Sequence, residues 1–274
     1  MNKKLLSLYS LKFNPFSQTV PTSALWTTPA LESFCWRVQE QIGEGGFALV
    51  TGQSGGGKSA ALRLLSDRLC LRRDLMLGHV SRPQASLADF YRELGHLYGV
   101  SLSPHNRWNS SKVLREKWLA HIDASLCRPV LLIDEAQEMK PAIFSELRLI
   151  SSADLDSRSI LTIVLAGDQR LTGRLEEPDI IPVASRIRSR LRLEGLSSKE
   201  LADCLNCLLK AAGNLRLLPA SLIQTLCEHA AGNLRLLMNM ANDLLVEALK
   251  QEREQLDDKL FFEVFASEPK PKRA

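Results

Sequence analysis

A glycine-rich segment constrains this chain more than any other feature of its sequence. It runs Gly52-Gln53-Ser54-Gly55-Gly56-Gly57-Lys58-Ser59 and matches the phosphate-loop pattern G-x-x-x-x-G-K-[ST] at every fixed position. An apolar run, 47–51, precedes it and leucines at helical spacing follow it, which disfavours a merely flexible turn. Glycines let a backbone approach phosphate closely, and amides at a helix N-terminus attract its oxygens. We therefore predict a nucleotide-binding loop in which Lys58 contacts the β- and γ-phosphates. The residues of this loop are Gly52, Gln53, Ser54, Gly55, Gly56, Gly57, Lys58, Ser59 and Ala60.

An acidic pair follows the apolar run 130–133, and its first member lies 75 residues beyond Ser59. The acids would emerge at the carboxyl end of a central strand, beside the phosphate loop. Asp134 and the Ser59 hydroxyl would then hold Mg²⁺, and Glu135 would orient and polarise the attacking water. Strands often end in acids, but together with the loop this pair favours hydrolysis over nucleotide binding alone.

A third apolar run, 160–166, ends at Gly167-Asp168-Gln169-Arg170. A polar side chain here would lie between the two preceding motifs and could align the attacking water. Asp168 is the first candidate and Gln169 the second. An ordinary turn is the alternative, because Gly-Asp is a common turn pair.

Two arginine segments complete the candidate machinery. Arg186, Arg188 and Arg190 precede the last predicted strand, from where one of them, Arg186 by preference, could reach the nucleotide of a neighbouring subunit. A solvated basic edge is the alternative. Arg235 follows Asn233, a helix cap, and is the candidate nucleotide sensor. An identical octapeptide occurs at 211–218 and 230–237, but Pro219 ends the first copy, so we interpret Arg216 as a surface residue.

The hydrophobic pattern predicts two parts, with a boundary near residue 195. Up to that point short apolar strands alternate with helices, which is typical of a parallel sheet covered on both faces. Beyond it only helical periods occur. The predicted domains are an N-terminal extension with a first helix (1–45), an α/β core (46–195), a helical lid (196–266) and a flexible tail (267–274). Residues 1–30 are expected to be irregular before a helix that reaches about 42. The predicted strands are 47–51, 75–80, 130–133, 159–166 and 190–193, and the predicted helices are 59–71, 86–98, one capped by Ser110 or Ser111, 141–150, 198–212, 219–229, 233–250 and 257–265.

Composition excludes some classes of protein without choosing a function. A net charge of +4, with 45% hydrophobic and 24% charged residues, is ordinary for a soluble globular chain and does not establish a nucleic-acid partner. The apolar runs fall short of the roughly 20 residues that cross a bilayer. We expect a cytoplasmic protein without membrane contact. Cys204 and Cys207 form a C-x-x-C with no second pair, which favours packing over a zinc site.

The order of these motifs resembles that of the AAA+ ATPases. The detailed likeness is to the TniB/TnsC/Mu B-like transposition regulators and the related secretion ATPase ExeA, and it covers roughly residues 10–250. It rests on the segments 11–16, 132–137, 164–171 and 192–197. The resemblance implies an α/β AAA+ P-loop NTPase with a parallel five-stranded sheet of order 5-1-4-3-2 and a C-terminal all-helical lid. It also implies ATP and Mg²⁺ as cofactors, and Phe16 packing near the adenine.

The resemblance further implies partners. ExeA-like proteins continue into a membrane span and a peptidoglycan-binding region, which this sequence lacks, so we favour the transposition branch. Its members form rings or filaments on duplex DNA, contact the backbone without sequence preference, and recruit or activate a transposase. The implied DNA contacts are Arg107, Trp108, Lys112 and Arg115, for which a solvated helix face is the alternative. The alternative functions are a secretion or envelope-assembly ATPase and a switch that binds ATP without turnover.

Overall fold

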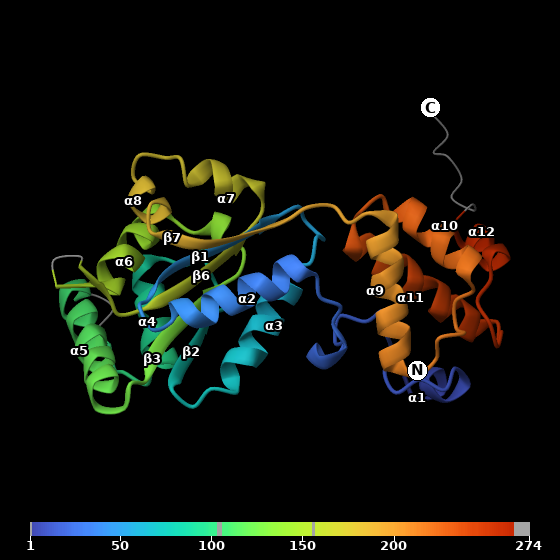
Figure 1. Cartoon of the computed structure of the whole chain (residues 1–274), viewed down its shortest axis with the longest axis horizontal. Helices are drawn as coiled ribbons and strands as arrows, with labels where there is room; N and C mark the ends of the chain where they lie inside the picture. Colours follow the sequence, from blue (N-terminus) through green and yellow to red (C-terminus); the bar gives the residue numbers. More distant parts are fainter. Residues whose placement is uncertain (1, 103–105, 155–156, 266–274) are drawn as a thin grey trace. The chain divides into compact units, whose positions relative to one another are not determined.

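The computed structural model describes residues 2–102, 106–154 and 157–265, and the predicted tail, 267–274, lies outside them. The chain divides into two compact units, coloured along the sequence in Figure 1. The α/β unit contains Thr27–Ser54 and Lys58–Leu193. The helical unit contains the described residues of Met1–Trp26, Gly55–Gly57 and Glu194–Ala274.

A parallel sheet of five strands forms the centre of the α/β unit. Its order is β2-β3-β6-β1-β7. When these five strands are numbered 1 to 5 along the chain and the sheet is read from its other edge, this is the predicted order 5-1-4-3-2. Continuous apolar runs form the central strands because both faces of the sheet are covered. The strands are β1 (Gly46–Gly52), β2 (Leu75–Val80), β3 (Arg128–Ile133), β6 (Thr162–Gly167) and β7 (Ile187–Leu193), with the antiparallel pair β4 (Ser152–Ala153) and β5 (Arg158–Ser159) apart from them.

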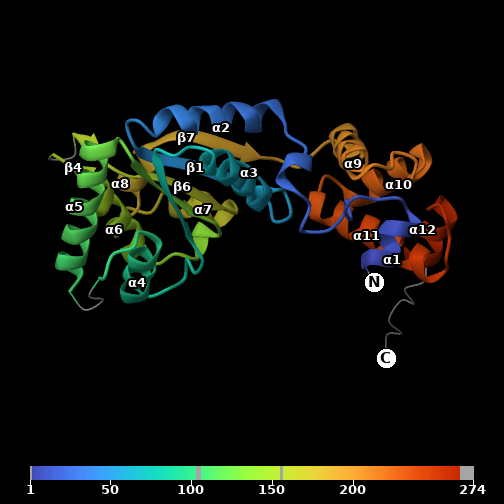
Figure 2. The same cartoon turned by 90° about the horizontal axis from the view of Figure 1, so that it is seen from below.

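Helices pack on both faces of this sheet (Figure 2). Alternate residues of each strand point to opposite faces, so Ala48 and Val50 pack with α2 and α3, whereas Phe47 and Leu49 pack in the core of the other face. The helices are α2 (Pro29–Gln41) and α3 (Lys58–Cys70) on the first face, and α4 (Leu87–Leu97), α5 (Arg107–Ser125), α6 (Pro141–Ser151), α7 (Gln169–Arg174) and α8 (Ile181–Ala184) on the second, with the short 3-10 helix η2 (Ala136–Glu138) after β3.

The helical unit combines the start of the chain with residues from 194 onward. Leu5, Tyr9, Leu11 and Phe16 lie in one core with the leucines of the C-terminal helices. Residues 1–30 are expected from the sequence to be irregular. This expectation is wrong for Asn2–Leu8, which form the helix α1. The other elements of this unit are η1 (Thr22–Ala24), α9 (Ser198–Ala212), α10 (Ala220–Ala230), α11 (Leu234–Lys250) and α12 (Asp258–Phe265).

Cys204 of the C-x-x-C segment lies buried in α9. Burial raises the pKa of Cys204 to about 12, so the thiol stays protonated at neutral pH. Among the described residues no group of three or more His, Cys, Asp or Glu side chains is arranged to hold a metal ion. None of the helices in the described ranges is long and apolar enough to cross a bilayer.

Several predicted boundaries are wrong. The strand expected at 159–166 begins at Thr162 as β6, because Ser159 belongs to the short strand β5. Helix α5 begins at Arg107 and is capped by Asn106, whose side chain accepts a hydrogen bond from the amide of Asn109, rather than by Ser110 or Ser111. Strand β7 begins at Ile187, three residues earlier than expected, and alternates buried and exposed side chains. Arg188 therefore lies within this strand rather than before it.

Candidate functional site

The phosphate loop connects the end of β1 to the start of α3. A Cβ at Gly52 would lie 2.4 Å from the carbonyl oxygen of Leu193, so the end of β7 leaves room for glycine only. Gly55 and Gly57 have φ angles of +81° and +92°, which other residues adopt at a cost. Helix α3 then begins at Lys58. The loop therefore has the backbone of an anion site that ends at a helix N-terminus.

Lys58 lies folded back on this loop. Its side chain is buried, with 6% of the residue exposed, and Nζ donates hydrogen bonds to the carbonyl oxygens of Gly52 (3.1 Å) and Gln53 (3.0 Å). Carbonyl oxygens stabilise an ammonium group less than phosphate oxygens do. Phosphate would therefore compete favourably for a cation that the loop already holds in place.

Ser59 and Asp134 meet although 75 residues separate them in the sequence. The Ser59 hydroxyl donates a hydrogen bond of 2.6 Å to Asp134 Oδ2, and the amide of Glu135 donates one of 2.9 Å to Asp134 Oδ1. A hydroxyl and a carboxylate are hard oxygen ligands, which suit Mg²⁺ better than nitrogen or sulfur would. Together with the glycine loop and Lys58, this donor set fits a magnesium nucleotide.

Glu135 directly follows β3 and has a strained backbone. Its φ and ψ angles are 52° and 39°, in the left-handed region that few non-glycine residues occupy. Its side chain is exposed, and Gln137 Nε2 donates a hydrogen bond to Oε2 of its carboxylate. Strain of this kind often occurs at functional sites, where the surroundings maintain it.

Gln137 is a residue of the site to which the sequence assigned no role. Besides the contact with Glu135, its Oε1 accepts a hydrogen bond of 3.1 Å from the amide of Asp168. The side chain therefore links the ends of β3 and β6. The segment 132–137 was part of the family likeness, but nothing in its spacing indicated this bridge.

Asp168 caps α7. Its Oδ1 accepts hydrogen bonds from the backbone amide and the Nε of Arg170, and this guanidinium holds the carboxyl pKa below its usual value. The carboxylate thus remains ionised and tied to the start of the helix. Gln169 is the first residue of α7 and is exposed. The choice between Asp168 and Gln169 as the polar sensor stays a prediction.

The arginine segment lies at the other end of the sheet from the phosphate loop. Phe47, near the start of β1, pairs with Ile187, whereas Gly52 at its end pairs with Leu193. Arg186, whose Nη1 donates to the Pro182 carbonyl, is therefore separated from the loop by the length of β1, about 20 Å at 3.3 Å per residue. Arg188 pairs with Glu44, and Nη2 of Arg190 donates a hydrogen bond of 3.2 Å to the Ala184 carbonyl.

The two copies of the octapeptide adopt different structures. Asn233 caps α11 by accepting a hydrogen bond from the amide of Leu236, which places Arg235 exposed in the first turn, as expected. Arg216 is also exposed but lies in a turn, where Asn214 Oδ1 accepts from its amide. The sensor role of Arg235 stays a prediction.

Phe16 is a buried residue of the helical unit. It is 4% exposed and packs in the core that contains α9, α10 and α11. Its predicted contact with adenine stays a prediction.

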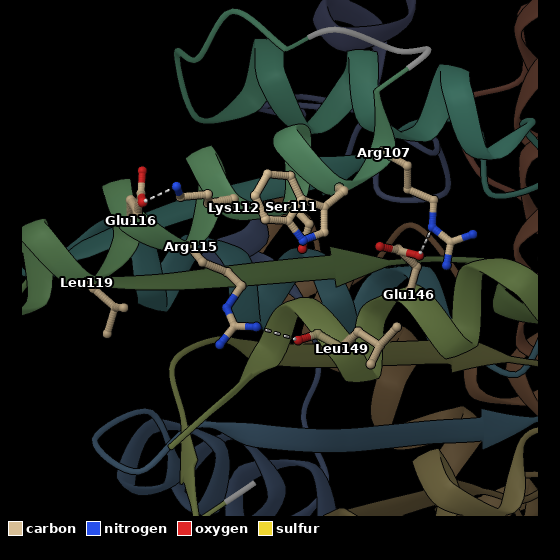
Figure 3. Close-up of a pocket in the computed structure, with 9 residues that line it drawn as sticks. Arg107, Ser111, Lys112, Arg115, Glu116, Leu119, Glu146 and Leu149 are labelled. Carbon is tan, nitrogen blue, oxygen red and sulfur yellow. Dashed lines mark hydrogen bonds and ion pairs between the residues drawn. The ribbon is translucent and has the colours of Figure 1, made fainter. Parts of the chain in front are cut away.

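The four predicted DNA contacts gather at one groove beside α5 and α6. Arg107, Trp108, Lys112 and Arg115 all line a cavity of ≈ 740 Å³, and Figure 3 shows three of these side chains extending from α5. Trp108 is 74% exposed, and Lys112 Nζ lies 5.5 Å from the centre of its ring. The structure therefore brings the four side chains to one surface, and their contact with DNA stays a prediction.

Carboxylates partly neutralise this groove. Glu146, buried in α6, lies 2.8 Å from Arg107 Nε, and Glu116 lies 3.7 Å from Lys112 Nζ (Figure 3). Burial raises the pKa of Tyr91, whose hydroxyl donates a hydrogen bond to Glu146 and so helps to stabilise this buried carboxylate. Any anion at the groove must compete with these two carboxylates.

Comparisons with known proteins agree with this geometry. A family model described as AAA domain matches residues 40–175. General secretion pathway protein A of Aeromonas hydrophila is 27% identical over 208 residues, which are 74% of this chain and 37% of that protein. The matched region thus spans little more than a third of this relative's length.

Two solved structures from Aeropyrum pernix have a similar fold. The ORC2 protein in ADPNP-ADP complexes has a TM-score of 0.70 at 15% identity, covering 93% of this chain and 71% of that one. The ORC1 protein in complex with DNA has a TM-score of 0.69 at 17% identity, covering 92% and 68%. The sheet order, the phosphate loop and these structures show that the chain has the AAA+ P-loop NTPase fold, and residues 40–175 match the AAA domain model.

Proposed function

We propose that this protein binds and hydrolyses ATP and that its ATP-bound form oligomerises on duplex DNA as a regulator of transposition that recruits or activates a transposase. One observation carries the hydrolytic part of this proposal. The Ser59 hydroxyl and the Asp134 carboxylate meet beside the phosphate loop, and Glu135, whose amide donates to Asp134 Oδ1, brings a second carboxylate to the end of the same strand. A loop that only bound nucleotide would not need a second carboxylate at this position.

In the proposed mechanism each residue has one task. Lys58 leaves its carbonyl partners and binds the β- and γ-phosphates, while Ser59 and Asp134 hold Mg²⁺. When bound there, Mg²⁺ would supply positive charge that stabilises negative charge developing on the phosphates. Glu135 accepts a proton from water as the water oxygen bonds to the γ-phosphorus and the bond to the β,γ-bridging oxygen breaks. The products are ADP and inorganic phosphate.

Arg186 would complete the site of a neighbouring copy. Because it lies at the opposite end of β1 from its own phosphate loop, it can act only on a nucleotide held by another protomer. Protomers would then join head to tail, as a ring or a helical filament. An arginine supplied in this way raises kcat by about 10³–10⁵.

Mixing two inactive variants tests this arrangement. Arg186→Ala protomers keep their phosphate loop, and Lys58→Ala protomers keep Arg186. We expect each alone to be nearly inactive, and an equimolar mixture to recover about a quarter of wild-type phosphate release if protomers mix randomly at head-to-tail interfaces. Recovery below a few per cent, in a mixture shown by sedimentation to co-assemble, would contradict a role in trans. The same mixtures with Arg188→Ala or Arg190→Ala distinguish the three arginines, and Arg216→Ala serves as a control.

The DNA part of the proposal is supported by the groove beside α5 and by the fold shared with an ORC1 protein solved in complex with DNA. Three cations and an exposed tryptophan at one surface suit contact with a phosphate backbone. Since Glu116 and Glu146 offset part of that charge, each protomer contributes only weakly. Affinity would then come from many protomers along one duplex, which explains how a chain of net charge +4 could bind DNA.

A gel-shift titration with duplex DNA and a slowly hydrolysed ATP analogue tests this proposal. We expect nucleotide-dependent binding at low salt, and a Lys112→Gln/Arg115→Gln double variant should weaken it at least tenfold and lower the salt slope by about 1–2 per bound protomer. A Lys210→Gln/Lys250→Gln variant, with the same charge change on the helical unit, should bind like wild type. If wild type binds no DNA with the analogue at low salt, the DNA part of the proposal is wrong.

A secretion or envelope-assembly ATPase that acts through protein partners is the second candidate. It is favoured by the similarity to a general secretion pathway protein A. The neighbouring gene distinguishes the candidates, because an integrase-like transposase supports the first and a secretion component the second. Steady-state phosphate release separates both from a switch that binds ATP without turnover.

A further inference from the structure

We infer that Gln137 is a positioning residue for hydrolysis, which holds the Glu135 carboxylate in register with the end of β6. The inference rests on the proposed ATPase activity. Gln137 Nε2 donates to Glu135 Oε2, and its Oε1 accepts from the Asp168 amide at 3.1 Å. The side-chain amide of Gln137 therefore donates to the acidic segment after β3 and accepts from the backbone at the end of β6.

The surroundings are built to hold this amide. Gln137 is 6% exposed, which is unusual for an uncharged polar side chain beside an exposed glutamate. Gly167 leaves space for it, because a Cβ at that position would lie 2.6 Å from Gln137 Oε1. Arg174 Nη1 donates to the carbonyl oxygens of Gln137 (2.6 Å) and Met139, which fixes the backbone around it.

This bridge explains how the strained backbone of Glu135 can serve catalysis. A glutamate carboxylate on an exposed turn samples several rotamers, and each misplaced rotamer lowers the fraction of molecules in a reactive geometry. A hydrogen bond to Oε2 restrains the carboxylate and leaves Oε1 to accept the proton of the water. Because the other end of the amide is bound to the Asp168 backbone, Glu135 and the β6 end move together.

The test compares Gln137→Met, which fills the same volume without hydrogen bonds, in two backgrounds. In wild type we expect kcat for phosphate release to fall about 10–100-fold while the ATP dissociation constant changes less than about threefold. In a Glu135→Gln background, followed by single-turnover release, the same substitution should change the rate less than about twofold. This non-additivity is expected only if Gln137 acts through Glu135.

A second variant and a control complete the design. Gln137→Glu keeps an oxygen that can accept from the Asp168 amide, but it places a second carboxylate against that of Glu135. The two negative charges repel each other, so kcat should fall at least as far as in Gln137→Met. Gln224→Met is the matched control, because Gln224 Nε2 also donates to a glutamate, Glu228, at 2.9 Å, but within α10. Near-wild-type kcat in both Gln137 variants, an equal loss in both backgrounds, or a loss confined to ATP affinity would each overturn the inference. A wild type that releases no phosphate would instead contradict the proposed function.

Discussion

Replacing Glu135 by glutamine should lower kcat for ATP hydrolysis by about 10²–10⁴-fold while ATP binding is retained, because a general base contributes about that factor. The substitution is nearly isosteric, and its amide oxygen can still accept the hydrogen bond from Gln137 Nε2 that Glu135 accepts now. Binding geometry should therefore survive while the proton acceptor is lost. Phosphate release and the affinity of a fluorescent ATP analogue measure the two effects separately. The variant should also remain in the assembled state with ATP, which sedimentation detects.

Glu138→Gln provides a control for this experiment. Glu138 lies three residues away, at the end of the short helix η2 that follows Glu135, and pairs with Arg170 at 2.8 Å. Its substitution should leave kcat within about twofold of wild type, as expected for a surface ion pair. If both variants hydrolyse ATP like wild type, Glu135 is not the general base.

Replacing Lys58 by alanine should weaken ATP binding by about two orders of magnitude or more, because hydrogen bonds to charged groups contribute about 1.5–3 kcal/mol each and Lys58 would make at least two. The readout is the rise in melting temperature with Mg-ATP, since a ligand stabilises the fold only in proportion to its binding. Wild type should show a clear rise and the variant none at the same ATP concentration.

The melting temperature without ATP shows whether the variant still folds. Lys58 now donates to two loop carbonyls, which water can hydrate once the side chain is removed, so we expect only a modest loss of stability. Lys140→Ala, at the exposed N-cap of α6, is a control in which the ATP-dependent rise should persist. An unchanged ATP-dependent rise in Lys58→Ala would contradict the assignment of the phosphate loop.

The strands and the loop were predictable because their signals are local, whereas the order of the strands in the sheet came from the family resemblance. A short apolar run such as 130–133 is typical of a buried strand. The phosphate-loop pattern requires a strand before the loop and a helix after it. The start of α5 was not predictable from helical period alone, because Asn106, Ser110 and Ser111 are all good caps and tertiary packing buries Ser110 completely. Helix α1 was missed because Leu5 and Tyr9 find their partners almost 200 residues later.

The same distinction applies to the site. Residues that a motif names, such as Ser59 and Asp134, are found together as predicted. Gln137 belongs to the site because β3 and β6 lie side by side in the sheet. Two strands become neighbours only when the sheet forms, so the sequence does not show this contact. The net charge of the α5 groove was also beyond prediction, because Glu146 comes from another helix and is buried against Arg107.

The joining of residues 1–26 with the C-terminal helices has a consequence for the order of folding during synthesis. Residues 2–26 are synthesised well before α9, α10 and α11, so their leucines and tyrosine must wait for these helices before they are shielded from water. The α/β unit, made of residues between them, can be complete while that segment is still without its core. A growing chain thus exposes an apolar segment to which chaperones can bind, and a bulky insertion beside Leu5 or Tyr9 would slow folding more than one placed in an exposed loop.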